Sequence, residues 1–383
     1  MRTLGRELEL RLERVRSSGL YRSLEDASPE AVDFCSNDYL NLSRDPRLRA
    51  FLIERLQEEA ASRPVSAPSS RLLRGNTPHH RLLEGKLARF KGTEAALVFP
   101  SGYQANLGLL SALMGPRDRV VSDRLNHASI IDGIRLSGAR KIIHRHRDLE
   151  AVRAALATPH PRGRTFLVTE SLFSMDGDIA PLDRYADLAE EWGADLIVDD
   201  SHATGLFGAG RGSGLTEHFG IEKRAAAIVS GCGKGLGVAG AFVAGPRTVI
   251  EYLVNVCRSF IFTTSTPPLL LYALEAALQI VGDDAERRER VLKLSDRLRL
   301  RLRGQGLDTL DSAGPIVPVI LGDNRRALAV ARRLREQGLD VRALRPPTVP
   351  AGTARLRISV HANHTPEQLD RLCRVLAEAL EAA

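Results

Sequence analysis

The sequence has 383 residues, of which 43% are hydrophobic and 26% are charged. A chain of this length can bury a large core and indicates two or three domains. No uninterrupted apolar run is long enough to cross a bilayer, and the charged N-terminus lacks the apolar core of a signal peptide. We therefore expect a cytoplasmic protein with no membrane partner.

The formal net charge of +7 requires nucleic acid to be considered as a partner. The arginines are nevertheless spread along the chain, and the densest run, 286–303, alternates with Leu and Glu as a solvated helix face does. We expect no nucleic acid, and a basic balance also suits phosphates or coenzyme A. The cysteines Cys35, Cys232, Cys257 and Cys373 form no C-x-x-C pair, which predicts reduced thiols and no metal site.

Hydrophobic periodicity divides the first part of the chain into helices and strands. The predicted elements are a helix within 1–24, a helix at 48–61, a loop at 62–76, a helix at 80–90, a strand at 94–99, a helix at 104–114 and a strand at 119–122. The turn Ser101-Gly102-Tyr103 is a candidate anion site, because free N–H groups and the helix dipole converge at a helix start. Many such turns bind nothing. His127 lies at another helix start, where a histidine is more often a polar capping residue than a catalytic one.

Three short apolar runs in the middle of the chain predict buried parallel strands at 165–170, 194–199 and 225–230. The segment 183–192 between the first two is helical by pattern. Ligands of such sheets collect beyond the carboxyl ends of the strands. The residues that follow these ends include an acid, an imidazole and a glycine-flanked lysine, namely Asp199, His202 and Lys234.

The rest of the chain continues the first domain and then predicts a second, smaller one. The expected elements are first a strand at 239–245, a helix to 257, a strand at 258–268 and one long helix at 269–302 that bridges the two domains. The smaller domain would then contain a strand at 316–321, a helix at 325–337, strands at 341–344 and 356–360, and a helix at 366–380. We expect an α/β protein with an N-terminal segment (1–50), a large, mostly parallel sheet domain (51–285) and a small α+β C-terminal domain (286–383).

Lys234 has two functional interpretations on its glycine-rich loop. A phosphate-binding P-loop needs G-x-x-x-x-G-K-[S/T], but Ile228 and Gly235 break that pattern, and no G-x-G-x-x-G opens a helix after a first strand. The other interpretation is a Schiff-base lysine, beside which glycines leave room for a flat ring. A surface lysine would be favoured if Lys234 stood alone.

Other residues match the needs of pyridoxal phosphate (PLP). This cofactor takes a lysine for its aldehyde, a carboxylate for its pyridine nitrogen, backbone N–H groups for its phosphate and often a flat ring against its face. Lys234, Asp199, the turn at Ser101-Gly102-Tyr103 and His127 supply one group each. A carboxylate that ends a buried strand is costly without a cation, and a pyridinium partner resolves that cost.

Several stretches resemble the α-oxoamine synthases, PLP-dependent transferases of fold type I, the aspartate aminotransferase-like fold. The matching stretches are Phe34–Leu40, Ser101–Asn106, Asn126–Ser129, Glu170–Asp178 and Asp199–Gly205. These enzymes condense an amino acid with an acyl thioester and release carbon dioxide. Arg345–Pro350 and Gly352–Arg357 are most similar to the members that join L-alanine to a pimeloyl thioester, on coenzyme A or an acyl carrier protein, in biotin synthesis.

The resemblance implies a role for each site residue, and it implies a homodimer. The catalytic set would be Lys234, His127, Asp199 and His202. The cofactor contacts would add Gly102, Tyr103, Ser174, Ser230, and Thr263 or Thr264 from a neighbouring subunit, with Glu170 as an acid behind them. The substrate contacts would be Arg22, Asn37, Arg345, Thr348 and Arg357.

The sequence departs from the family at two places. The usual Thr three residues before the lysine is Gly231, which weakens cofactor binding or passes the role to Ser230. Ser66–Ser69 replaces a glycine-rich run where the family shapes its acyl pocket, so a sibling activity such as glycine C-acetyltransferase or a long-chain acyl synthase is an alternative. A different class, a non-catalytic binding module with this fold, is disfavoured because Lys234, Asp199 and both histidines are present together.

Overall fold

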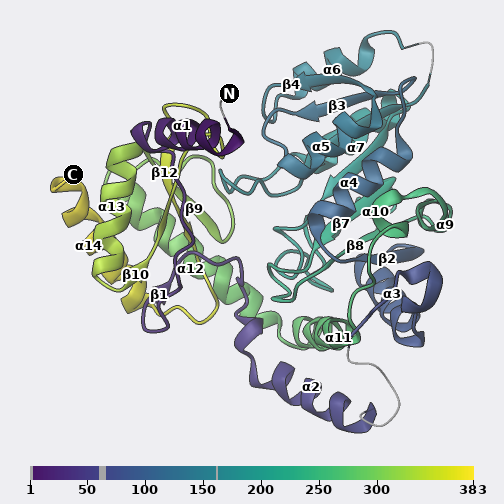
Figure 1. The fold of residues 1–383 in the computed structure, drawn as a ribbon, viewed down its shortest axis with the longest axis horizontal. Helices are drawn as coiled ribbons and strands as arrows, with labels where there is room; N and C mark the ends of the chain where they lie inside the picture. The colour runs from purple at the N-terminus through teal and green to yellow at the C-terminus, as the bar shows by residue number, and fades with distance from the viewer. Residues whose placement is uncertain (1–2, 60–65, 161–162) are drawn as a thin grey trace. The chain divides into compact units, whose positions relative to one another are not determined.

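The computed structural model describes residues 3–59, 66–160 and 163–383, and these form two compact units (Figure 1). The central unit consists of Asn37–Ser174 and Ile179–Val291. The terminal unit joins the segment that ends at Ser36 to Leu292–Ala383, together with the short stretch Met175–Asp178. The N-terminal segment is therefore grouped with the C-terminal residues.

A sheet in the order β2-β8-β7-β6-β5-β3-β4 forms the centre of the central unit. Its strands are β2 (Ala95–Phe99), β3 (Arg119–Asp123), β4 (Arg140–His144), β5 (Thr165–Glu170), β6 (Asp195–Asp199), β7 (Ala227–Gly231) and β8 (Ala241–Gly245). β3, β4, β5, β6 and β7 pair in parallel, and β8 is antiparallel to both β7 and β2. The prediction of a mostly parallel sheet is confirmed, although the sequence had indicated neither β4 nor the direction of β8.

Helices cover both faces of this sheet. The helices and helical turns of the unit are η1 (Leu42–Arg44), α2 (Pro46–Glu59), η2 (Arg71–Gly75), α3 (Pro78–Lys91), α4 (Gly102–Leu113), α5 (Ala128–Ser137), α6 (Leu149–Ala157), α7 (Leu182–Glu191), α8 (Leu215–His218), α9 (Arg247–Val256), α10 (Arg258–Ile261) and α11 (Pro268–Asp283). Successive strand side chains alternate between two cores, as the pleat of a strand requires. Phe166 and Val168 of β5 pack with α4, α5, α9 and α10, whereas Leu167 between them packs with α6 and α7.

Three predictions about this unit need correction. The run 258–268 was expected to be a strand, but it begins with the helical turn α10, whose Phe260 packs edge-on against Phe99 with ring centroids 5.7 Å apart. A short apolar run bounded by prolines does not distinguish a strand from a buried helical turn. The expected loop 62–76 contains the π-helical turn η2, and its residues 62–65 lie outside the described part. The long helix expected at 269–302 is two helices, because the chain leaves helical geometry at Asp284 (φ −122°, ψ 63°).

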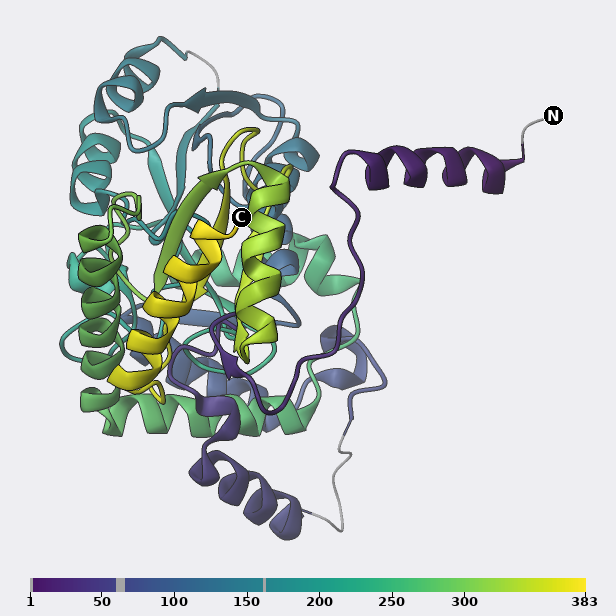
Figure 2. The same cartoon turned by 90° about the vertical axis from the view of Figure 1, so that its left-hand side faces the viewer.

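The terminal unit is an α+β arrangement, as predicted for the C-terminal part. Its elements are α1 (Leu4–Ser17), β1 (Val32–Asp33), the end of α12 (Ala285–Gly304), β9 (Ile316–Gly322), α13 (Asn324–Glu336), β10 (Leu339–Asp340), β11 (Arg342–Leu344), β12 (Ala354–Ser359) and α14 (Pro366–Glu381). The order β11-β12-β9 is antiparallel throughout. Figure 2 shows α13 and α14 side by side, and both bury a stripe of apolar residues in one core with the sheet.

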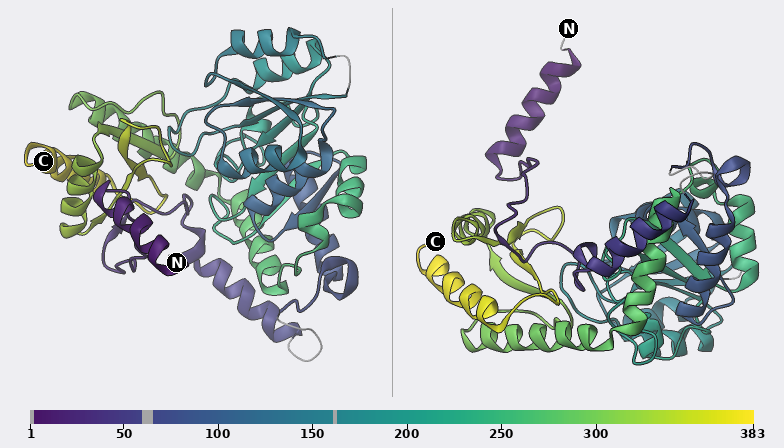
Figure 3. Two further views of the ribbon diagram at one scale, coloured as in Figure 1. Left: turned by 45° about the horizontal axis from the view of Figure 1, so that its top comes forward. Right: turned by 90° about the horizontal axis from the view of Figure 1, so that it is seen from below.

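The N-terminal segment is tied into this core at one place. β1 pairs in parallel with β10, and the ring of Phe34 is fully buried. The two histidines that follow β12 hold the same stretch: His361 Nε2 contacts the Ser36 carbonyl oxygen at 3.0 Å, and His364 Nε2 contacts the Asp33 carbonyl oxygen at 2.9 Å. By contrast, α1 has no buried residue and projects from the rest of the unit in Figure 3.

Among the described residues, no helix combines the length and the apolar character needed to cross a membrane. The four cysteines are free thiols, as predicted.

Candidate active site

The polar residues of the central unit gather at one edge of its sheet. Glu170 at the end of β5 pairs in register with Asp199 at the end of β6, and Gly231 ends β7 next to the start of β8. The end of β2 meets the other side of the same β8 residue, where Phe99 pairs with Ala241. The order of the strands therefore places the ends of β2, β5, β6 and β7 at one edge of the sheet.

Asp199 is a buried carboxylate held by neutral donors. It is 7% exposed, and it accepts hydrogen bonds from Asn106 Nδ2 (2.6 Å) and from the Ser201 backbone N–H (3.0 Å). Within the described residues no lysine, arginine or histidine forms an ion pair with it. A buried carboxylate of this kind is costly unless a cation pairs with it.

His127 caps α5 and is linked to Asp199 through two side chains. The Ser129 backbone N–H donates to His127 Nδ1 (3.2 Å), so Nδ1 is an acceptor, and the Ser129 hydroxyl lies 2.8 Å from the same atom. Asn106 Nδ2 donates to that hydroxyl (3.0 Å) as well as to Asp199. Burial lowers the pKa of His127, Lys234 also lowers it, and Asp199 opposes them. The ring is thus a neutral, flat imidazole.

Lys234 lies on a loop that could not be built without glycine. A Cβ at Gly235 would overlap the Thr204 carbonyl oxygen, and a Cβ at Gly205 (φ +89°) would come within 3.1 Å of Gly235. The lysine loop and the loop after β6 therefore pack backbone against backbone. Lys234 itself is half-buried.

The start of α4 faces the lysine loop. Ser101 caps the helix by accepting from the Gln104 N–H (3.3 Å), and a Cβ at Gly102 would lie 3.7 Å from Gly231 Cα. Gln104 Nε2 also donates to Thr263 (3.3 Å), whereas Thr264 is exposed. The free N–H groups of a twelve-residue helix thus lie beside the lysine loop.

Tyr103 is the second residue of α4 and is 44% exposed. Its hydroxyl is hydrogen-bonded to Asp132, which raises the pKa of the tyrosine. Its ring meets His127 edge to face, with centroids 6.5 Å apart.

His202 contacts a tyrosine that the sequence did not single out. The Tyr39 hydroxyl lies 2.7 Å from His202 Nδ1 and donates to Asn37 Oδ1 (3.2 Å). Both Tyr39 and His202 are buried. Tyr39 therefore connects two predicted site residues.

Glu170 and Ser174 are buried near the same edge. Burial, together with the charge of Asp199, raises the pKa of Glu170 well above its usual range, although Lys234 and the backbone N–H groups of His127 and Ser174 oppose this shift. One of its carboxyl oxygens has no hydrogen-bond partner. Burial of Glu170 therefore favours its protonated, neutral form.

A buried ion pair supports the loop after β6, and sequence reasoning missed it. Lys91 and Asp200 are fully buried, and Lys91 Nζ donates to Asp200 Oδ2 (2.8 Å) and to the Thr204 hydroxyl (3.0 Å). The Thr204 hydroxyl in turn donates to Ser230 (3.0 Å), whose side chain is buried. The sequence carried no signal for Lys91, because a lysine near the end of an amphipathic helix is normally exposed.

The predicted substrate residues Arg22, Arg345, Thr348 and Arg357 belong to the terminal unit. Arg22 Nη2 lies 3.4 Å from the Thr348 hydroxyl, and Arg345 binds the carbonyl oxygens of Gly19 and Tyr21. These three residues lie together. Arg357 is elsewhere, on β12, where it is 8% exposed and donates to Ser359 (3.0 Å).

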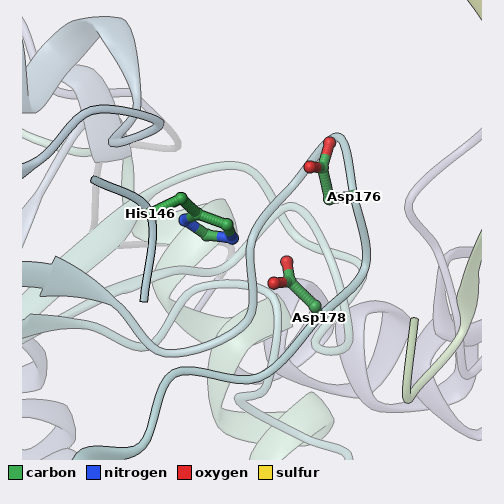
Figure 4. Close-up of side chains that lie close together, drawn as sticks. All are labelled: His146, Asp176 and Asp178. Carbon is green, nitrogen blue, oxygen red and sulfur yellow. The ribbon is translucent and has the colours of Figure 1, made fainter. Parts of the chain in front are cut away.

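A second arginine on β12 has a different environment. Arg355 is ion-paired with Asp176, which shares a loop with Asp178 in Figure 4. Asp176 neutralises Arg355, which argues against Arg355 as a contact for a substrate anion.

The residues present fit PLP. Four features lie at one edge of the sheet: a buried carboxylate that forms no ion pair with the described residues, an imidazole ring, a lysine on a glycine-rich loop and the start of a helix. Each of them can bind one chemical group of that cofactor. Asn106, Ser129 and Tyr39 join them. All three stood within recognised stretches of the sequence, but a single sequence does not reveal which side chains meet.

Comparisons with known proteins identify the family and the fold. A family model described as aminotransferase class I and II matches residues 29–376. An 8-amino-7-oxononanoate synthase from Anaeromyxobacter sp. (strain Fw109-5) is 47% identical, over 97% of this chain and 95% of that protein.

Two solved structures are also similar. Serine palmitoyltransferase from S. paucimobilis, solved with bound PLP, has a TM-score of 0.91 at 30% identity and covers 100% of this chain and 99% of its own. 8-Amino-7-oxononanoate synthase from Francisella tularensis has a TM-score of 0.79 at 28% identity, over 93% and 99% of the two chains. The predicted fold class and the resemblance to α-oxoamine synthases are confirmed, and the chain belongs to the class I and II aminotransferase family, with the architecture of fold type I PLP enzymes.

Proposed function

We propose that this chain is a PLP-dependent acyltransferase that joins L-alanine to a pimeloyl thioester and releases carbon dioxide and the free thiol, giving 8-amino-7-oxononanoate for biotin synthesis. The observation that carries the proposal is the buried Asp199, which forms no ion pair with any described residue, on the strand beside the one that leads to Lys234. Relatives named for this reaction, 42–47% identical over nearly the whole chain, support the choice of substrates.

The central unit would hold the cofactor. Asp199 would bind the pyridine nitrogen, the N–H groups of Gly102 and Tyr103 would bind the phosphate, and the His127 ring would lie against the cofactor. When bound, PLP stabilises negative charge on the amino-acid α-carbon. Asn106 fixes the Asp199 carboxylate through its 2.6 Å hydrogen bond, so the group that meets the pyridine nitrogen is oriented in advance.

Lys234 would bind the cofactor aldehyde and, once replaced there by the amino acid, move the α-proton. A lysine that accepts a proton must be neutral part of the time. His202, held by Tyr39, would lie near the phenolic oxygen of the cofactor. The raised pKa of Glu170 favours its neutral form, which limits the negative charge beside Asp199.

The terminal unit would supply substrate contacts. Arg357 would bind the carboxylate of the amino acid, which a planar guanidinium recognises with two parallel hydrogen bonds, and the family resemblance assigns Asn37 to the same group. Arg22, Thr348 and Arg345 form a basic cluster suited to the acyl substrate. Ser174, Thr263 and Thr264 toward the cofactor, a homodimer and a cytoplasmic location belong to the same proposal. Ser230, the alternative phosphate contact of the sequence, is instead engaged by Thr204.

The test is turnover by the purified protein. L-Alanine and glycine are each assayed with pimeloyl, acetyl and palmitoyl thioesters, on coenzyme A and on acyl carrier protein. We expect turnover of L-alanine with a pimeloyl thioester above every other pair. Preference for glycine with acetyl-coenzyme A would refute the substrate assignment in favour of the sibling activity. A colourless protein that binds no PLP would refute the cofactor assignment as well.

A further inference from the structure

Gly231 leaves a space beside Lys234 that a hydroxyl from another loop fills. A Cβ at Gly231 would lie 3.1 Å from Lys234 Nζ and 3.1 Å from the Ser201 hydroxyl oxygen. Both distances are shorter than ordinary van der Waals contact, so a side chain at 231 and the hydroxyl of Ser201 compete for one place. The Gly231 backbone N–H donates to that hydroxyl (2.7 Å), which fixes it there.

The backbone holds Ser201 on its other side as well. Its N–H donates to Asp199 Oδ1 (3.0 Å), and the residue is only 5% exposed. Since the hydroxyl oxygen accepts from Gly231, its own hydrogen remains to be donated, and no described residue takes it. The hydroxyl is thus an oriented donor next to Lys234 and close to Gly231. Gly231 in turn lies beside the start of α4, since a Cβ built at Gly102 would be 3.7 Å from Gly231 Cα.

Ser230, the other hydroxyl near Gly231, has a different environment. It is fully buried and accepts a hydrogen bond from Thr204. Thr204 belongs to the network around Lys91, which lies behind the loop. A shift of Ser230 toward a ligand would break that network, whereas Ser201 needs no shift.

We propose that Ser201 is a cofactor-binding residue, whose hydroxyl donates to the phosphate of PLP from the place that a side chain at 231 would occupy. This proposal rests on the proposed function, since it presupposes that PLP binds at this edge. Ser201 and Gly231 form a matched pair, because Ser201 supplies the hydroxyl and glycine at 231 leaves space for it.

The experiment measures the dissociation constant of PLP by absorbance titration of apoprotein for the wild type, Ser201→Ala, Gly231→Thr and the double variant. We expect about tenfold weaker binding for Ser201→Ala, which corresponds to about 1.4 kcal/mol. Gly231→Thr should also bind more weakly, because threonine crowds Ser201 and Lys234. The double variant should bind more tightly than either single variant, because the new hydroxyl then has the space to itself. Ser137→Ala, which removes a buried hydroxyl bonded to the Ile134 carbonyl oxygen within α5, is the matched control and should leave the constant unchanged.

Pyridoxal, which lacks the phosphate, tests the contact itself. Ser201→Ala should weaken PLP binding but leave pyridoxal binding within twofold of the wild type, and this comparison also detects a variant that merely misfolds, since such a variant loses both. Equal weakening of both ligands, unchanged PLP binding by Ser201→Ala, or a double variant no better than Gly231→Thr would overturn the inference while leaving the proposed function intact. A wild-type protein that binds no PLP overturns both.

Discussion

Replacing Asn106 by alanine tests whether the orientation of Asp199 matters for the cofactor. The amide of Asn106 makes two buried hydrogen bonds, one to the Asp199 carboxylate at 2.6 Å and one to the Ser129 hydroxyl at 3.0 Å. The first is charge-assisted and short, and bonds of that kind contribute about 1.5–3 kcal/mol. The second joins neutral groups and contributes about 0.5–1.5 kcal/mol.

The change in the PLP dissociation constant depends on whether the apoprotein or the PLP-bound protein is destabilised more by the loss of this hydrogen bond. In the apoprotein, water can replace the missing amide at Asp199, whereas bound PLP excludes that water. We therefore expect most of the loss in the PLP-bound form, a dissociation constant about 10- to 150-fold higher for Asn106→Ala. Ser129→Ala removes the neutral bond to Asn106 and the hydroxyl contact with His127 Nδ1 but leaves the bond to Asp199, and should cost about 2- to 10-fold.

The assay is absorbance titration of the apoprotein with PLP, combined with kcat and the KM for L-alanine at saturating PLP. We expect kcat to fall with cofactor affinity while the KM for L-alanine changes little, because Asn106 contacts no substrate group. If Asn106→Ala binds PLP within twofold of the wild type, or if Ser129→Ala costs as much, the hydrogen-bond argument is refuted.

Three further predictions concern other parts of the molecule. Lys91→Met should lower the free energy of unfolding by about 3–5 kcal/mol, because it leaves Asp200 buried without its cation; Lys91→Met with Asp200→Asn should recover part of the loss, measured by denaturant unfolding of the apoprotein. Arg357→Ala should raise the KM for L-alanine at least tenfold with an unchanged PLP dissociation constant; loss of PLP binding instead would contradict a substrate role. Burial lowers the pKa of His364 from 6.5 to about 3, so between these values the unfolded chain binds a proton that the folded chain does not. Stability should be full above pH 6.5 and fall toward pH 3, and His364→Gln should flatten that dependence in unfolding curves recorded at a series of pH values.

The strands and the acid-to-lysine arrangement could be predicted because each rests on a local pattern. Buried parallel strands are continuous apolar runs, and their carboxyl ends share an edge, so the order of residues alone indicates that Asp199 and Lys234 lie near each other. Strand β4 was not predicted because its residues are mostly exposed or half-buried. It lies at the edge of the sheet and has the sequence Arg-Lys-Ile-Ile-His. Edge strands do not carry the apolar run of central ones.

Contacts between distant segments could not be predicted. No local sequence pattern indicates that Lys91 pairs with Asp200. The hydrogen-bond partner of His202 is likewise Tyr39, more than 160 residues earlier. The division of the helix expected at 269–302 depends on one residue, Asp284, within otherwise helix-forming sequence. The space filled by Ser201 is likewise visible only when two loops are seen in three dimensions.

The pairing of β1 with β10 bears on how the chain folds during synthesis. The ring of His364 packs against Phe34, and its Nε2 contacts the Asp33 carbonyl oxygen, so the terminal unit cannot close until His364 has been synthesised. The central unit is formed almost entirely from residues between 37 and 291 and can fold while the ribosome is still adding the rest. We expect the apolar side chains around Phe34 to wait exposed during that interval, which makes the N-terminal segment the part of a nascent chain that most needs a chaperone.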